Sequence, residues 1–267
     1  MSTAGTMLRG WRTRRRRSQM DLALEANVST RHLSFVETGK AHASRALLID
    51  LATRLEVPLR ERNALLLAAG YAPSYPESVL DDLSAVREAL HHLVTGHEPY
   101  PALVVDRRGD VVLTNGAVTT LLAGLDPAFL APPVNIYRLA LHPGALAPRI
   151  RNRAQWSGHL LHRLDRLVDL TGDPRLVALR AEVGPWVPDD RTVPVLDRAA
   201  QLMLPLHLEH PELGELRFYS TITHFGAAFD VTLDELSIET FVPADAATRE
   251  ALGSAQPTAV PSSMPMP

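Results

Sequence analysis

The chain has 267 residues, of which 46% are hydrophobic and 21% are charged, so it is long enough for two domains with apolar cores. It contains no cysteine, which excludes a disulfide framework, a thiolate zinc site, an iron–sulfur cluster and a cysteine nucleophile. No apolar run approaches the roughly 20 residues that a membrane-spanning helix needs. We therefore expect a cytoplasmic protein that makes no contact with a membrane.

Charge is distributed unevenly along the chain. The formal net charge is −3, yet residues 1–60 hold 11 Lys and Arg against 5 Asp and Glu, and the remainder holds 16 against 25. The densest basic stretch contains Arg9, Arg12, Arg14, Arg15, Arg16 and Arg17. A basic segment joined to an acidic one indicates a polyanionic partner for the first 60 residues alone. A solvated N-terminal arm would have the same composition.

Residues 8–72 have the pattern of consecutive short helices. Apolar residues recur at helical spacing, and the pattern is interrupted at Asn27, Gly39, Pro58 and Gly70. We expect four or five helices of roughly 8 to 11 residues, packed into an all-α domain over residues 1–73. Prolines and tyrosines between Tyr71 and Pro76 mark its boundary.

Residues 78–253 are expected to form a second, α+β domain. Helical spacing over residues 79–94 is followed by two β-rich runs, 102–106 and 111–115, around a polar turn that contains Gly109. These runs predict a hairpin. Helical patterns return over residues 117–183, and three more β-rich runs follow at 201–208, 214–223 and 227–231. This order predicts one antiparallel sheet. The Pro- and Ser-rich residues 254–267 are expected to be a disordered tail.

The segment from Ser18 to Lys40 is the most informative part of the first domain. A short apolar-faced helix ends at Asn27, a residue type that tolerates a left-handed turn. Val28 then enters the core, and Ser29 caps a second helix that Gly39 closes. With Leu33 and Val36 facing inward, the outer face of this second helix presents Thr30, Arg31, Ser34 and Phe35. Such a helix suits the DNA major groove, although an ordinary helical hairpin has the same pattern.

This segment resembles the helix-turn-helix of the xenobiotic-response-element (XRE) family, which has the lambda-repressor-like fold. The resemblance is carried by Ser18-Gln19, Leu22-Ala23, Val28-Ser29, Leu33-Ser34, Glu37 and Gly39. It implies binding to double-stranded DNA at an operator, with contacts from Gln19, Ser29, Thr30, Arg31, Ser34, Phe35, Lys40 and Arg45. It also implies an internal ion pair between Arg12 and Glu37. Ala43 stands where many members of the family carry a proline.

Arg31 is the strongest candidate for reading a base. Its guanidinium has the fork of donors that suits guanine, and no other residue on that outer face has one. Phe35 fits a thymine methyl group or a plain packing role equally well.

Nearly the whole chain apart from its tails is similar to the MmyB-like branch of that family, found in actinobacteria. The similarity lies in Leu59–Pro73, Pro99–Arg107, Phe218–Gly226 and Asp230–Leu236. It implies a ligand-binding domain of Per-Arnt-Sim (PAS) type, in which helices roof the concave face of an antiparallel sheet. A small apolar effector, for instance a fatty-acyl-like molecule, would bind there. Gly109 replaces an aromatic residue that many relatives carry before the second strand.

Candidate ligand-binding residues follow from chemistry, because a small-molecule cavity needs apolar walls and a few polar anchors. The candidates are Tyr137, His142, Arg149, Asn152 and Trp156 in the helical roof, and Phe218 and Phe225 on the closing strands. For each aromatic residue the alternative is a plain core position. Arg149 would pair with an effector carboxylate, or would be a surface charge.

Motifs of enzyme chemistry are not found in the sequence: there is no nucleophile elbow, phosphate-binding loop or dinucleotide fingerprint. The pairs His159/His162 and His207/His210 have metal-ligand spacing, but neither has a third ligand at a suitable distance. We therefore expect no enzyme, no metal and no cofactor other than the effector.

The sequence thus predicts a one-component transcription regulator whose DNA affinity depends on the effector. We expect a homodimer on a palindromic operator. The alternative is a DNA-binding regulator whose second domain is a protein-interaction or dimerisation module without a ligand. A lined apolar cavity would favour the sensor, and an exposed apolar patch the interaction module.

Overall fold

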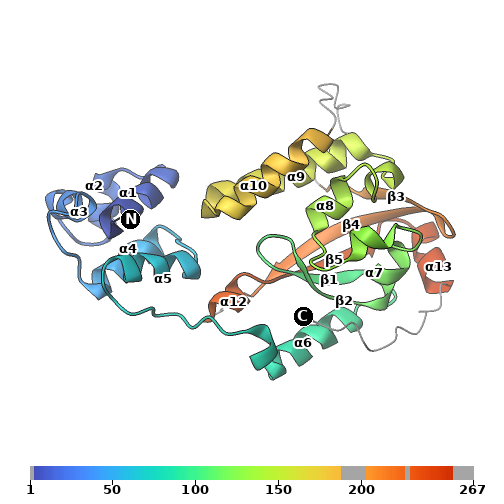
Figure 1. Ribbon diagram of the computed structural model, residues 1–267, viewed down its shortest axis with the longest axis horizontal. Helices are drawn as coiled ribbons and strands as arrows, with labels where there is room; N and C mark the ends of the chain where they lie inside the picture. The colour runs from blue at the N-terminus through green and yellow to red at the C-terminus, as the bar shows by residue number, and fades with distance from the viewer. Residues whose placement is uncertain (1–2, 188–202, 226–228, 255–267) are drawn as a thin grey trace. The chain divides into compact units, whose positions relative to one another are not determined.

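The computed structural model describes residues 3–187, 203–225 and 229–254 (Figure 1). They divide into two units. The first contains the chain up to Val79, with residues 167–172 and 229–234; the second contains the rest. Within the described ranges, no helix is both long enough and apolar enough to cross a membrane.

The described part of the first unit is helical, as the sequence predicts. Its N-terminal helices are α1 (Ala4–Arg14), α2 (Gln19–Glu25), α3 (Thr30–Glu37), α4 (Arg45–Arg54) and α5 (Leu59–Ala68). Hydroxyl side chains accept hydrogen bonds from the first turns of four of them, at Thr3, Ser18, Ser29 and Ser44. The apolar faces of the helices meet in one core that includes Leu8, Trp11, Leu22, Leu33, Leu48, Leu51, Leu65 and Leu66.

The turn between α2 and α3 is set by local chemistry. Asn27 has φ +52°, the left-handed conformation that the sequence predicts. The N–H of Val28 donates to the carbonyl of Ala23 at 2.9 Å, which closes the end of α2, and the Val28 side chain packs against the core. Ser29 Oγ accepts from the N–H of His32 at 3.1 Å and caps α3, which begins at Thr30, three residues after Asn27.

The end of α3 has the same kind of closure. Gly39 has φ +74°, and its N–H donates to the carbonyl of Val36 at 3.1 Å. The next N–H, of Lys40, reaches the carbonyl of Phe35 at 2.8 Å. This pair of bonds is a Schellman motif, for which glycine is the preferred residue.

The second unit contains an antiparallel sheet of five strands in the described residues. The strands are β1 (Ala102–Val105), β2 (Val111–Thr114), β3 (Leu206–His210), β4 (Gly214–His224) and β5 (Ser237–Pro243), in the order β2-β1-β5-β4-β3. An antiparallel sheet with helices on its face is the PAS-like α+β architecture expected from the sequence.

Helices cover both faces of this sheet (Figure 1). They are α6 (Ser84–Thr95), α7 (Gly116–Leu121), α8 (Ile136–Leu141), α9 (Arg153–Thr171, in this unit up to residue 166), α10 (Pro174–Val183) and α13 (Ala246–Ser254). Short 3₁₀ turns lie at Leu80–Asp82, Pro127–Leu130, Ala147–Arg149 and Gly184–Trp186. In the figure, α8, α9 and α10 lie on one side of the sheet and α6 on the other.

Strand register decides which side chains face α7, α8 and α9. Residues paired across the ladders share a face, and Leu103 pairs with Glu239 while Leu206 pairs with Phe218. We call this side the roofed face: Leu103, Val105, Leu206, Leu208, Leu216, Phe218, Glu239 and Phe241. Val118 of α7 and Ile136 of α8 pack against its β1 residues.

The β1–β2 hairpin is present as predicted, and it explains Gly109. This residue has φ +81°, where a side chain is strained. A Cβ there would also lie 2.8 Å from the Tyr137 ring. Glycine therefore permits both the turn and the close approach of α8.

One predicted strand is wrong, and one strand of the sheet was missed. The expected strand at 227–231 is absent in its described part, because Asp230 caps a short helix, α12 (Val231–Asp234), by accepting the N–H of Thr232 at 2.8 Å. The strand β5 was not predicted, since it carries the polar residues Ser237 and Glu239 on a buried face. Strand β3 begins at Leu206 rather than at residue 201, which lies outside the described residues. Of the expected tail, only Ser254 is described, and it is helical.

Candidate DNA interface and ligand-binding site

Helix α3 presents the side chains expected at a DNA major groove. Thr30 and Arg31 are exposed, and Ser34 and Phe35 are half-buried. The Arg31 guanidinium carbon lies 5.3 Å from the centre of the Phe35 ring. Stacking of this kind is worth about 0.5–1 kcal/mol at an exposed site and restrains the guanidinium on the outer surface of the helix. Ser29 lies at the N-cap of the same helix.

A buried ion pair fixes this helix to α1. Arg12 Nε and Nη2 donate to the two carboxylate oxygens of Glu37 at 2.7 and 2.9 Å. Glu37 has no exposed side-chain surface, and that of Arg12 is 12% exposed. Burial opposes ionisation of Glu37, but the hydrogen bonds from Arg12 and Gln19 keep its pKa below the ordinary value. The pair therefore fixes the C-terminal end of α3 against α1.

The side chain of Gln19 belongs to this cluster. Its Nε2 donates to Glu37 Oε2 at 2.7 Å, so the amide expected to contact the DNA backbone is turned toward the ion pair. The first residue of α2 is thereby linked to the last residue of α3.

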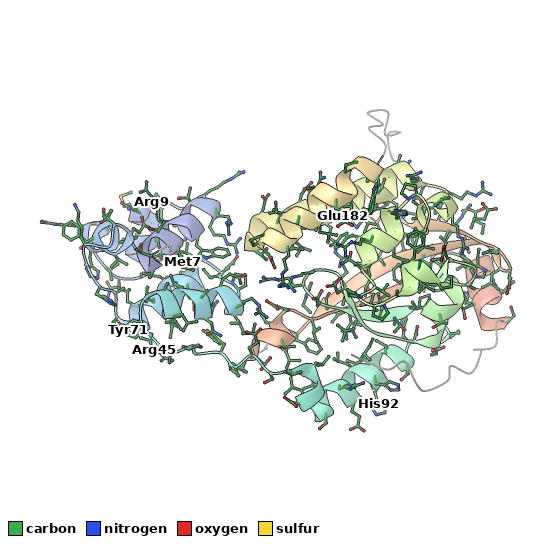
Figure 2. All side chains as sticks on the ribbon, in the orientation of Figure 1. Met7, Arg9, Arg45, Tyr71, His92 and Glu182 are labelled. Carbon is green, nitrogen blue, oxygen red and sulfur yellow. The ribbon has the colours of Figure 1, made fainter. Side chains whose placement is uncertain are left out.

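The arginine run in α1 and directly after it separates into two sets. Arg15 donates to the carbonyls of Leu55 and Glu56, both at 2.9 Å, and so closes the end of α4. Arg17 pairs with Glu25, and Arg12 with the carboxylate described above. The exposed set is Arg9, Arg14 and Arg16 (Arg9 is labelled in Figure 2). The basic face of this domain is therefore smaller than the sequence run suggests.

The two remaining DNA candidates lie in the loop after α3 and at the first residue of α4. Lys40 and Arg45 are both exposed, and Arg45 Nη2 donates to Ser74 Oγ at 2.7 Å (Figure 2 labels Arg45 and Tyr71). Ala43 is buried, and its carbonyl accepts the Tyr71 hydroxyl at 3.0 Å. That bond restrains the loop at the position where relatives were expected to carry a proline.

The aromatic ligand candidates differ in burial. Tyr137, Trp156 and Phe218 have 1%, 4% and 0% of their surfaces exposed, whereas His142 and Phe225 are half-buried. Phe218 lies on the roofed face, edge-on to Phe241 with ring centres 6.1 Å apart. The centre of the His142 ring lies 4.8 Å from that of Phe129 and 4.7 Å from that of Trp186.

The polar ligand candidates are engaged with the backbone. Arg149 donates to the carbonyls of Ala123 and Gly124 at 2.8 and 2.7 Å. Asn152 donates to the carbonyl of Pro205 at 2.7 Å and accepts the N–H of His207 at 3.0 Å. Arg149 thereby joins its 3₁₀ turn to the loop after α7, and Asn152 holds its own loop against β3.

A buried ion pair on the roofed face was missed by sequence reasoning. Arg163 Nη1 of α9 lies 3.0 Å from Glu239 Oε2 of β5, with side chains 18% and 6% exposed. The Arg163 guanidinium carbon is 5.9 Å from the centre of the Tyr137 ring. Burial raises the pKa of Tyr137, so its hydroxyl stays protonated. The two charged residues are 76 positions apart, and no local signal links them.

A second buried charge network surrounds Arg107, two residues after the end of β1. Its guanidinium lies 3.0 Å from Asp173 and 3.1 Å from Glu235. Burial would raise the pKa of Asp173, but hydrogen bonds from the Arg175 N–H and from Arg107 keep it below the ordinary value. At Asp173 and again at Glu235 the chain returns from the first unit to the second. Within the second unit, the network therefore connects the two segments that begin at these residues.

The histidine pairs take no part in a metal cluster in the described chain. No group of three or more His, Asp or Glu side chains suited to a metal ion occurs there. His210 Nε2 instead lies 2.9 Å from the carbonyl of Thr120, and its Nδ1 accepts the N–H of Leu213 at 3.1 Å. This ring links the end of β3 to α7.

A search of curated proteins gives no match. A solved structure, "Structure of an RNA-binding Light-Oxygen-Voltage Receptor", aligns over 92% of this chain at 14% identity with a TM-score of 0.27. The chain spans 60% of the length of that protein. Residues 8–62 match the helix-turn-helix family model, and residues 86–255 match that of the MmyB-like transcription regulator ligand binding domain. The chain belongs to the family of MmyB-like transcription regulators, with a helix-turn-helix domain before the ligand-binding domain.

Proposed function

We propose that this DNA-binding transcription regulator is a one-component sensor. The first unit recognises an operator, and a small, largely apolar effector bound in the second unit changes the affinity for that operator. The observation that carries the proposal is the exposed face of α3, held by the buried Arg12–Glu37 pair, in the same chain as a ligand-binding domain. Linkage requires that the effector bind the DNA-competent and DNA-incompetent states with different affinities.

Sequence recognition is assigned to the N-terminal half of α3. Arg31 donates to a guanine in the major groove, and Thr30 and Ser34 contact neighbouring bases or phosphates. Phe35 supports the Arg31 guanidinium and is available to a thymine methyl group. Lys40, Arg45 and the exposed arginines of α1 neutralise phosphates. A single domain of this size makes few such contacts, so a cytoplasmic homodimer binds a palindromic operator with half-sites about one DNA turn apart.

The effector is assigned to the roofed face of the sheet. Phe218 supplies buried aromatic surface on that face, and Tyr137 and Trp156 supply it from the covering helices α8 and α9. A fatty-acyl-like molecule requires apolar surface of this kind. Arg149 and Asn152 act by holding the surrounding loops, because their polar groups are already engaged.

DNA recognition is tested by selecting a binding site from a random library and measuring affinity for wild type, Arg31→Ala and Arg9→Ala. Arg31→Ala should lose about 1–3 kcal/mol on the selected site and should relax specificity at one base pair. Arg9→Ala, which changes an exposed arginine outside α3, should leave specificity unchanged. An equal loss for Arg31→Ala on selected and random DNA would mean that Arg31 contacts only phosphate.

Effector binding is tested by native mass spectrometry of the purified chain, followed by denaturing extraction. The proposal expects an apolar small molecule that co-purifies or that can be added back. A dimer that takes up no small molecule would favour the alternative, a second domain that binds a protein partner without a ligand.

A further inference from the structure

The Tyr137 hydroxyl is buried without a hydrogen-bond partner. Only 1% of the residue is exposed, and within the described part of the chain its oxygen contacts no donor or acceptor. Buried polar groups are nearly always paired, so an unpaired one calls for an occupant that supplies the missing bond. The ring is held in place because it packs against the backbone of Gly109 at the β1–β2 turn.

The charges beside this hydroxyl balance one another. Arg163 pairs with Glu239 at 3.0 Å, and the Arg163 guanidinium lies 5.9 Å from the Tyr137 ring. Glu239 is on the central strand of the sheet, where 4% of the residue is exposed. His159 interacts electrostatically with both charges, and burial lowers its pKa, so it is neutral at pH 7. The cluster therefore has one positive and one negative charge and, with the neutral phenol, no net charge.

Because the cluster is already neutral, it restricts the charge of any ligand group that binds beside Tyr137. A carboxylate entering the cluster would leave one buried negative charge in excess, or would displace Glu239 from its partner, and both are strongly unfavourable. An uncharged acceptor, such as a ketone, ester or amide carbonyl, receives the phenolic hydrogen and disturbs neither charge. Arg149, the other arginine considered for an anion, directs its Nη1 and Nη2 to the carbonyls of Ala123 and Gly124.

We propose that Tyr137 binds the polar end of the effector, and that this end is an uncharged hydrogen-bond acceptor rather than a free carboxylate. The assignment rests on the proposed ligand-sensing function and names the ligand class at the same site. Tyr137 is the binding residue, and Arg163 and Glu239 set the charge that the site accepts.

The test uses the full chain, freed of bound small molecules, and two probes of equal chain length at pH 7: 2-undecanone and undecanoate. Calorimetric titration should show that wild type binds the ketone at least about tenfold more tightly than the anion. Tyr137→Phe removes one oxygen and should weaken ketone binding about five- to tenfold. Its melting temperature should not fall, because the hydroxyl has no partner to lose. Tyr219→Phe, at a half-buried position on the opposite face of the sheet, should bind as wild type does.

Three results would overturn the proposal. Ketone affinity unchanged in Tyr137→Phe would remove the role of the hydroxyl, and tighter binding of undecanoate would refute the uncharged class. In both cases the measured binding would leave the sensor function standing. If neither probe binds, the ligand class is wrong, and the co-purification experiment then decides separately whether the domain binds any small molecule.

Discussion

Replacing Glu37 by alanine should be the most damaging change of a single charge in the DNA-binding unit. The carboxylate has no exposed surface and accepts three hydrogen bonds, two from Arg12 and one from Gln19. The Glu37→Ala variant leaves the Arg12 guanidinium almost fully buried without a counter-charge. Breaking a buried pair in this way costs about 3–5 kcal/mol. Because a whole domain is stable by about 5–15 kcal/mol, this loss is a large fraction of the total.

Hydrogen exchange with mass spectrometry on the full-length chain measures this loss locally. Amides of α1 and α3 should exchange faster by a factor that corresponds to about 3–5 kcal/mol in the opening free energy. Glu25→Ala is the matched control, because Glu25 pairs with Arg17 at a site where both side chains are about 40% exposed. Such a pair is worth about 0–1 kcal/mol. Equal losses in the two variants would refute the assignment of α3 positioning to the buried pair.

Three further predictions concern stability. Because folding lowers the pKa of Glu37, its ionised carboxylate stabilises the first unit above the ordinary pKa near 4.5, and this stabilisation is lost as pH falls through the lower folded pKa. In Glu37→Gln the free energy of unfolding of the first unit should therefore depend less steeply on pH in this acidic range. Gly5→Ala should destabilise α1 by more than about 1 kcal/mol, since a Cβ would lie 2.2 Å from a carbonyl oxygen of α3. Gly10→Ala on the same helix meets nothing within 4 Å and should stabilise it by about 0.5–1 kcal/mol; chemical denaturation compares the two. Gly109→Ala combines φ +81° with a contact of 2.8 Å to the ring of α8, whereas Gly214→Ala has φ +74° and open space. Thermal unfolding should therefore show a clearly larger loss for the first of these two variants.

The parts of the fold that the sequence predicts are those with local causes. The turn at Asn27, the cap at Ser29 and the closure at Gly39 each depend on the chemistry of one residue and its neighbours within five positions. The same holds for the hairpin around Gly109. Such features are readable because backbone conformation and capping are short-range effects.

Features that depend on distant partners were not predictable. Strand β5 places Glu239 on a buried face, which breaks the apolar pattern of a strand, and the reason is Arg163 on another element. The N-terminal arginine run has a uniformly basic sequence, because nothing near Arg15 reveals that it closes the end of α4. The sequence makes Asn152 a candidate ligand anchor, because the backbone that engages its amide lies more than 50 positions away.

The dependence of DNA affinity on the effector tests the central claim most directly. The selected operator is titrated with full-length protein that carries the co-purified small molecule and with the same protein after its removal. The account predicts a change in affinity of at least about fivefold, reversed when the molecule is added back, since allosteric coupling is typically about 1–3 kcal/mol. Equal affinities with and without the molecule, while binding of both DNA and the molecule is retained, would contradict it.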